Sequence, residues 1–448
     1  MAVYLPAIKK LVSPELYPYG ANFSLAYIPW TTFHSFVSGF IQATRLPVDW
    51  AIFLLQIVSV FLFLLGCLVV IRKCILEPTA QWAGVALVAA LSTLPVTGTG
   101  LFLVDQHLHP RTIATAYLLF ALVALLERKP RTLLWAFLAA LCHPVMALYG
   151  FFHLLVLALP PLLPQAGILF SAIPMSVPSN PIWRDVMSHR QFQYPLLWEW
   201  YEWLGVVAPL FLLLAYARLG LRNNMPVLAR VCTRLVISTG VGVIAAIILT
   251  TSFPAQTWER FEPMRVLHLT YVLFVLISGA LLGKYILHSH WPRWLALFLP
   301  LCLGMFYAQR HEFPASHHIE WPGRSSGNAW VDAFDWVRQN TPRNALFALD
   351  PQYMSRPGED FHGFAGIAER TMLADSVKDN SVVEVFPDLA YQWKLEVSAR
   401  QGWSRFGVAD FERLKKDLGV SWVVLERPGV GGMPCPYVND AVMVCRVP

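Results

Sequence analysis

A series of apolar runs in the first 310 residues constrains this chain more than any other feature. About eight of them are long enough, or nearly so, to cross a hydrocarbon core of about 30 Å. The runs cover residues 49–71, 80–97, 112–127, 132–158, 204–220, 230–252, 264–284 and 292–309. The chain is only 14% charged, whereas a soluble chain carries about 25% charged residues. Since so few polar residues could not cover eight apolar helices in water, the sequence predicts a polytopic α-helical membrane protein.

Charge divides the chain into two parts. Residues 311–448 hold 14 of the 34 Lys/Arg and 18 of the 28 Asp/Glu, which leaves 20 and 10 for residues 1–310. We therefore expect an outer-face loop at residues 1–48, a transmembrane helical bundle at 49–310 and an acidic soluble domain at 311–448. The net charge of +6 is spread over the loops, so we expect the lipid bilayer and not nucleic acid as a partner.

Helix and strand signals alternate in residues 311–448. The predicted helices are 329–340, 381–400 and 410–418, and the predicted strands are 345–349, 422–425 and 441–447. Helices on the faces of a small sheet are the natural fold for such a pattern, so we expect a C-terminal α/β domain.

Lys and Arg in the short loops predict the orientation of the bundle. They gather near Arg72, Arg128, Arg218 and Lys284, which places these loops in the cytoplasm. Residues 1–48, the loops at 98–111, 159–203 and 253–263, and the soluble domain then face the periplasm or the cell exterior. Eight of the ten acids before His311 fall on that side. An active site that needs carboxylates is therefore expected on the outer face.

Residues 31–43 predict an amphipathic helix in the first outer segment. Phe33, Phe36, Val37, Phe40 and Ile41 fall on one face of it. Such a helix can lie along the membrane surface or pack on the bundle, and the sequence does not distinguish the two.

The densest group of chemically active residues is FLVDQHLHPR at 102–111. Asp105, His107 and His109 alternate, so in an extended segment they share one face. A carboxylate with two imidazoles suits proton abstraction or a divalent metal, and Arg111 beside them suits a phosphate. We predict that these three residues are catalytic or hold a metal. The alternative is a pair of solvated loop histidines.

Two further groups extend the candidate site. His143 lies inside an apolar run, where an ionisable residue is a functional hypothesis. The alternative is an imidazole that forms a hydrogen bond between helices. In WERFEPMR at 258–265, Arg260 and Arg265 suit a lipid phosphate or could extend to the headgroups. With His143, Glu259 is a possible cavity residue.

The seven cysteines show no spacing typical of a zinc site. Cys435 and Cys445 are the two cysteines of the C-terminal domain, which the charge pattern places in an oxidising compartment. Pro434 and Pro436 favour a turn that returns the chain toward Cys445, so we predict a disulfide between the two. The alternative is a pair of free thiols.

Several segments resemble a known group of proteins. VYLPAIKKLVSPELYPYGANF, VDQHLHPR and HPVMALYG, with WVRQNTPRNALFALDP, FAGIAERTMLADSVKD and FPDLAYQWKLEVSARQG near the end of the chain, resemble bacterial inner-membrane proteins that carry a C-terminal domain of unknown function. Those proteins are similar to the GT-C membrane glycosyltransferases. The resemblance implies that a sugar is transferred from a polyprenyl-phosphate donor on the outer face, and that an essential carboxylate lies in the first outer loop.

The chain departs from the GT-C pattern at its start. No span precedes Val3, and Glu15 is a poor match for the family's acid, so we expect that translation starts upstream or that part of the site is lost. Asp105 is then the expected base, and Arg111, Arg260 and Arg265 are expected to stabilise the departing phosphate.

The alternative function is that of a transporter, flippase or assembly factor for envelope polysaccharide. Such bundles carry ionisable residues or broken helices within their spans. Besides His143, the best candidates here are His153, Arg234 and His268, so the balance favours a surface-facing site.

Overall fold

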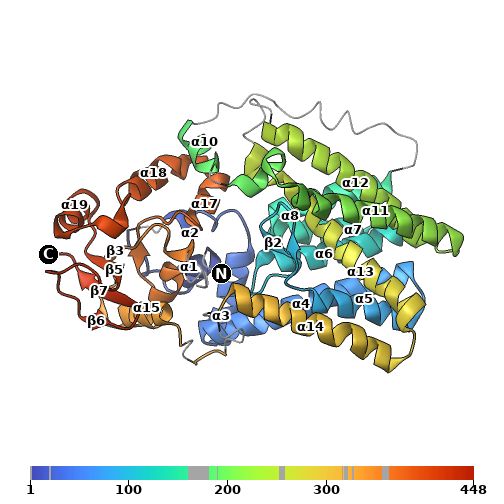
Figure 1. Ribbon diagram of the computed structural model, residues 1–448, viewed down its shortest axis with the longest axis horizontal. Helices are drawn as coiled ribbons and strands as arrows, with labels where there is room; N and C mark the ends of the chain where they lie inside the picture. The colour runs from blue at the N-terminus through green and yellow to red at the C-terminus, as the bar shows by residue number, and fades with distance from the viewer. Residues whose placement is uncertain are drawn as a thin grey trace. The chain divides into compact units, whose positions relative to one another are not determined.

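The computed structural model describes residues 3–19, 22–159, 181–188, 190–251, 258–314, 316, 321–324, 327–355 and 363–448. The chain is mostly helical, with one small sheet near its C-terminus (Figure 1). It divides into two compact units. Unit 1 comprises residues 1–53, 180–189 and 308–448, and unit 2 comprises residues 54–179 and 190–307.

Unit 2 is built from apolar helices. They are α4 (Val48–Cys74, which begins in unit 1), α5 (Pro78–Ala90), α6 (Pro110–Leu126), α7 (Arg131–Cys142), α8 (Pro144–Ala158), α11 (Trp200–Arg222), α12 (Pro226–Thr251), α13 (Val266–Leu282, continued by the π-helix Gly283–Leu287) and α14 (Trp291–Glu312, which ends in unit 1). Among the described residues, four stretches are long and apolar enough to cross a membrane. They are Val48–Cys74, Trp200–Arg222, Pro226–Thr251 and Trp258–Leu287.

The helix expected at residues 80–97 is shorter than predicted. α5 ends at Ala90, and Pro95–Val96 (β1) pairs with Leu101–Phe102 (β2) in an antiparallel hairpin. The residue before a proline avoids helical backbone, so Pro95 ends the helical pattern. The prediction was wrong at this end because it counted apolar residues across a proline. The hairpin leads the chain directly into the segment that holds Asp105.

The helix expected at residues 132–158 is broken. α7 ends at Cys142 and α8 begins at Pro144, with extended backbone at His143 between them (φ −152°, ψ 93°). Because proline lacks an N–H and clashes with the preceding turn, Pro144 starts a new helix. The single span of the prediction is therefore two shorter helices, and His143 lies at the break.

Helix α13 is the central helix of unit 2. Of its most apolar window 83% is buried, compared with 28–44% for the other three candidate spans. Glycines bring α13 close to α5: a Cβ at Gly279 would lie 2.7 Å from the carbonyl oxygen of Ala83, and one at Gly84 would lie 2.7 Å from that of Leu276. Polar groups carried by α13 are therefore held inside the helical unit.

The C-terminal part of unit 1 is an α/β fold, as predicted. Its sheet has the order β4-β3-β5-β7-β6, with parallel pairing around β3 and antiparallel pairing around β7. The strands are β3 (Leu346–Ala348), β4 (Thr371–Met372), β5 (Trp422–Glu426), β6 (Tyr437–Val438) and β7 (Val442–Arg446). The helices are α15 (Ala329–Asn340), α16 (Phe364–Ala368), α17 (Asp379–Val385), α18 (Ala390–Ser398) and α19 (Val408–Leu418).

Two apolar cores lie against this sheet. Phe334 of α15 packs in one core with Phe347 and Val424, whereas Phe411 of α19 packs in the other with Val423. Since successive residues of a strand point to opposite faces, α15 and α19 cover opposite faces. The helix expected at 381–400 is divided into α17 and α18 at Pro387, which cannot continue a helix.

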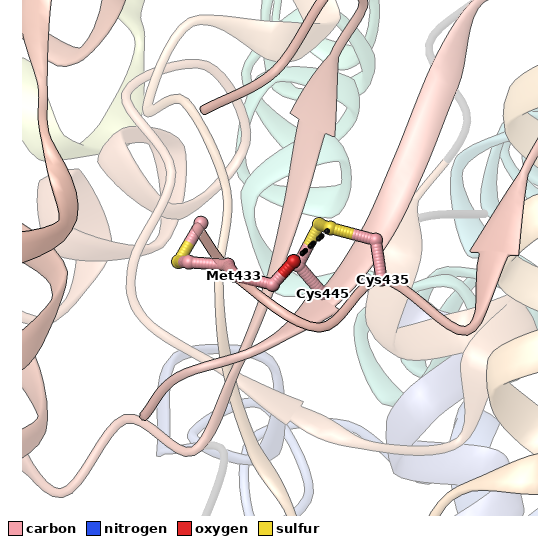
Figure 2. Close-up of a disulfide and its surroundings, with 3 residues drawn as sticks. All are labelled: Met433, Cys435 and Cys445. Carbon is pink, nitrogen blue, oxygen red and sulfur yellow. Dashed lines mark hydrogen bonds between the residues drawn. A yellow bond between two sulfur atoms is a disulfide. The ribbon is translucent and has the colours of Figure 1, made fainter. Parts of the chain in front are cut away.

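Cys435 and Cys445 are joined by a disulfide, as the sequence analysis expects (Figure 2). Cys445 lies in β7, and Cys435 lies in the segment before β6. The sulfur of Cys435 is 3.5 Å from the carbonyl oxygen of Met433. The bridge fastens the last strand of the sheet to the chain that leads into its neighbour.

Segments far apart in the sequence complete unit 1. They are α1 (Tyr4–Val12), α2 (Asn22–Leu25), α3 (Phe33–Thr44) and α10 (Pro181–Ser188). Lys9 of α1 forms an ion pair with Glu369 at 2.7 Å, and the indole N–H of Trp183 in α10 donates to the carbonyl oxygen of Val383 at 3.1 Å. Residues 3–44 and 181–188 therefore fold together with the C-terminal domain.

Candidate functional site

The loop after β2 brings Asp105 and Arg111 together at the start of α6. The Oδ1 of Asp105 accepts from Nη2 of Arg111 at 2.5 Å, and its Oδ2 accepts from Nε at 3.4 Å. The hydroxyl of Thr112 donates to the same Oδ2 at 3.1 Å, and Gln56 of α4 donates to the Asp105 backbone carbonyl at 2.9 Å. Both oxygens of the carboxylate are thus already engaged.

These contacts decide the charge state of Asp105. Burial raises the pKa of this carboxyl, but the charge of Arg111 and the hydrogen bonds from Arg111 and Thr112 outweigh burial and hold the pKa below its usual value. An ionised carboxylate in such a pair is a weak proton acceptor. The geometry therefore argues against the predicted role of Asp105 as the base.

His109 caps helix α6. Its Nδ1 accepts from the backbone N–H of Arg111 at 3.2 Å and lies 3.9 Å from Oδ2 of Asp105. Burial, and then the nearby charge of Arg111, hold the pKa of His109 well below its ordinary value. The ring is therefore neutral at pH 7. Because Nδ1 is an acceptor, the ring carries its hydrogen on Nε2.

His107 lies in different surroundings from Asp105 and His109, whose side chains are only 14% and 13% exposed. The backbone bends at Gln106 and His107, and His107 is exposed. The extended segment that the alternation assumed is therefore absent. In the described part of the chain, no three His, Cys, Asp or Glu side chains are placed to hold a metal ion. A metal held by Asp105, His107 and His109 stays a prediction, and in this structure Arg111 donates to both oxygens of the carboxylate.

His143 caps α8 much as His109 caps α6. Its Nδ1 accepts from the backbone N–H of Met146 at 3.3 Å. The two imidazole rings lie nearly parallel, with centroids 6.3 Å apart. Both histidines precede a proline that begins the helix. This repeated His-Pro pair is a signal in the sequence that the prediction passed over.

The segment 258–265 contributes Arg265 to the group. Arg265 precedes α13 directly, and it interacts electrostatically with His109 and His143. Glu262 forms ion pairs with Arg265 and, at 3.3 Å, with Arg190.

The other two predicted residues of this segment have different contacts. Arg260 lies over the ring of Phe261, with its guanidinium carbon 4.9 Å from the ring centroid. Glu259 is buried and accepts a hydrogen bond from Tyr194 at 2.9 Å.

His268, one turn into α13, completes the group. It interacts electrostatically with Asp105, Arg111 and Arg265. The sequence analysis named His268 only as an ionisable residue in an apolar run. Its proximity to Asp105 depends on the packing of α13, which no local pattern reveals.

Three helix N-termini thus converge, those of α6, α8 and α13. Each is preceded by a residue of the group: His109, His143 and Arg265. A helix N-terminus carries partial positive charge, so it favours an anion. One N–H group of α6 and one of α8 are bonded to the capping histidines, and α13 continues directly from the 3₁₀ helix Pro263–Arg265. With the guanidinium groups of Arg111 and Arg265, the arrangement can bind an oxyanion.

Comparisons with known proteins add no family to this description. No protein-family model matches the sequence, and no curated protein is significantly similar to it, so the function has to be inferred from the residues of the site.

Proposed function

We propose that this chain is a GT-C-like membrane glycosyltransferase, or an inactive relative, that takes a sugar from a polyprenyl-phosphate donor on the outer face of the membrane. The observation that supports the proposal is the convergence of three helix N-termini with Arg111 and Arg265. Oriented N–H groups and guanidinium groups of this kind stabilise a phosphate.

The reaction divides into two tasks for the protein. Arg111 and Arg265 stabilise the negative charge that grows on the phosphate oxygen as its bond to the sugar breaks. Asp105 holds Arg111 by two hydrogen bonds, so the guanidinium is oriented before the donor arrives.

Unit 1 contains α1, α10 and the C-terminal domain, which supports placing these three segments on the same side of the membrane. α1 and α10 pack on the C-terminal domain through the contacts of Lys9 and Trp183. A soluble domain lies on one side of the membrane, so these three segments share that side. The number of crossings between each pair of them must then be even.

An even number of crossings favours eight spans. Between α10 and the C-terminal domain, α11, α12 and the stretch that contains α13 are candidate spans, and α14, with 22 residues, makes four. Between α3 and α10, α4 is joined by the shorter α5, by α6 and by the broken pair α7–α8, which also makes four crossings. The proposed location is a bacterial inner membrane, as the resemblance implies, with the C-terminal domain periplasmic or extracellular, as the loop charges predict.

The test is a transfer assay with the purified full chain and radiolabelled polyprenyl-phosphate monosaccharides. Asp105→Asn keeps the side-chain shape but weakens the grip on Arg111, so we expect transfer to fall by about 10²-fold, as for the loss of one preorganised charge contact. Glu127→Gln is the matched control. Glu127 lies at the other end of α6 and pairs with Lys73 at 2.8 Å. Absence of transfer by the wild-type chain with every donor would contradict the proposal.

One observation favours a second function, that of a flippase or transporter. The break between α7 and α8 places His143 inside an apolar stretch, and broken helices with polar groups are typical of translocating bundles. A vesicle assay separates the two. A flippase moves the lipid-linked sugar to the other leaflet intact, whereas the transferase cleaves the bond between sugar and phosphate.

A further inference from the structure

One ring nitrogen of His268 is buried without a partner. The side chain is only 4% exposed. The ring forms a hydrogen bond with the backbone carbonyl of Phe102, and in the part of the chain that the structure describes its Nδ1 has no hydrogen-bond partner. The bond to Phe102 is therefore made by Nε2. Since a carbonyl only accepts, Nε2 carries the hydrogen and Nδ1 carries a lone pair. Buried polar atoms are rarely left unpaired, so this one needs an explanation.

His268 interacts electrostatically with four charged or titratable groups. They are Asp105 from the loop, Arg111 from α6, His143 at the start of α8 and Arg265 at the start of α13. Burial, and with it the two guanidinium groups, favours the neutral ring, which has a lone pair on Nδ1. The carboxylate of Asp105 stabilises the ring once it has accepted one.

We propose that Nδ1 of His268 is the general base of the transfer reaction and that Asp105 is a positioning residue. This inference rests on the proposed function and assigns the proton to a different residue than the sequence does. Asp105 already accepts hydrogen bonds from Arg111 and Thr112, whereas Nδ1 of His268 has a lone pair available. The carbonyl of Phe102 fixes the ring in the tautomer that the role requires.

The donor in this step is a sugar linked to a lipid phosphate. The acceptor hydroxyl gives its proton to Nδ1 while its oxygen bonds to the anomeric carbon. The bond between that carbon and the phosphate oxygen breaks, and its electron pair leaves with the lipid phosphate. The imidazolium then gives the proton to water that enters as the products leave, so the histidine returns to its starting form.

Chemical rescue and a pH profile test this role in the full chain. His268→Ala should lower kcat by about 10²- to 10⁴-fold, the usual contribution of a general base, and added imidazole should restore part of the loss. His268→Gln keeps an N–H that can reach the Phe102 carbonyl but has no basic nitrogen. It should fold normally, lose a similar factor in kcat, and lose the acidic limb of the kcat profile that the wild type shows.

His153→Gln is the matched control, because His153 is also buried but has both ring nitrogens occupied, by Ser238 and by the Val266 carbonyl. It should keep the wild-type rate and pH profile. Wild-type transfer together with full activity of His268→Gln would overturn the base assignment while leaving the proposed function in place. A folded His268→Ala protein that is inactive and does not respond to imidazole would overturn it as well. A wild-type chain without transfer activity would refute the proposed function, and the base assignment with it.

Discussion

Two His-Pro pairs orient the imidazoles of the candidate site. A proline at the first position of a helix loses no hydrogen bond, and it restricts the residue before it to extended backbone. His109 and His143 have this backbone, and each caps its helix through Nδ1. A two-residue sequence therefore decides which ring nitrogen faces the helix and which carries the hydrogen.

Asp379 in unit 1 is a buried carboxyl close to a second one, that of Asp375. Burial, and then the negative charge of Asp375, raise the pKa of Asp379 well above its ordinary value. Its carboxylate form therefore costs stability, and the cost grows as pH rises from about 4, near the unfolded pKa, through the folded value. Asp379→Asn removes the charge and keeps an oxygen that can accept from the Asp375 backbone N–H, a bond of 2.9 Å.

We expect Asp379→Asn to stabilise the protein at pH 7.5 by roughly 1–2 kcal/mol. Each kcal/mol should raise Tm by about 2–4 °C. The gain should vanish near pH 4. Thermal unfolding of the detergent-solubilised chain at both pH values measures this, with the exposed Asp388→Asn as the control. A lower Tm of Asp379→Asn at both pH values would show that the carboxyl is needed structurally.

For individual helices, the sequence predicted the position correctly where capping residues mark the helix ends. α15 begins after Asn328, whose side chain accepts from two backbone N–H groups, and α19 ends at Gly419 in left-handed backbone (φ 77°). These caps confirm the helices predicted at 329–340 and 410–418. Hydrophobic content alone was less reliable, because the runs at 80–97 and 132–158 contain the prolines that end or divide them.

Helix α3 was predicted from its amphipathic pattern, but the pattern did not predict which of its apolar side chains are buried. The helix predicted at 31–43 is present as Phe33–Thr44. Phe33, Val37 and Ile41 are buried within unit 1, whereas Phe36 of the same predicted face is 59% exposed. Packing on α1 buries only part of the apolar face. The periodicity of the sequence does not indicate which part. Contact of Phe36 with the membrane surface stays a prediction.

The disulfide between Cys435 and Cys445 is expected to stabilise the folded chain. It closes a short loop, with a sequence separation of 10, so chain entropy predicts a stabilisation of roughly 2–3 kcal/mol. Cys435→Ser with Cys445→Ser should lower the Tm of the chain by the corresponding amount, with the free thiol Cys302→Ser as the control. An unchanged Tm, or free thiols at both positions in the unreduced C-terminal peptide, would contradict the prediction.

At the scale of the whole molecule, the distant contacts could not be predicted from the sequence. Asp105 and His268 are neighbours only because α13 packs inside unit 2, and Lys9 meets Glu369 only because the start of the chain folds with its end. Residue types and composition pointed to an outer-face site near Asp105. They could not indicate that Arg111 donates hydrogen bonds to both oxygens of this carboxylate. Because of these bonds, His268 is proposed as the base instead of Asp105.

The proposed membrane orientation rests on loop charge and on the grouping of segments in unit 1. Reporter fusions after Gly323 should report the periplasm or exterior, and fusions in the loop from Arg128 to Arg131 should report the cytoplasm. A third fusion beside α10, after Ser188, should agree with the first, because both positions belong to unit 1. Disagreement between the first and third fusions would contradict the even number of crossings.

Sugar transfer in sealed vesicles tests whether the chain cleaves the bond between sugar and lipid phosphate. The vesicles carry the full chain with its C-terminal domain facing outward, a polyprenyl-phosphate sugar in the membrane, and a membrane-impermeant acceptor outside. We predict one polyprenyl phosphate released for each glycoside formed, with a loss of about 10²-fold in Asp105→Asn. Movement of the intact lipid-linked sugar between leaflets, without cleavage of the bond between sugar and phosphate, would contradict the account.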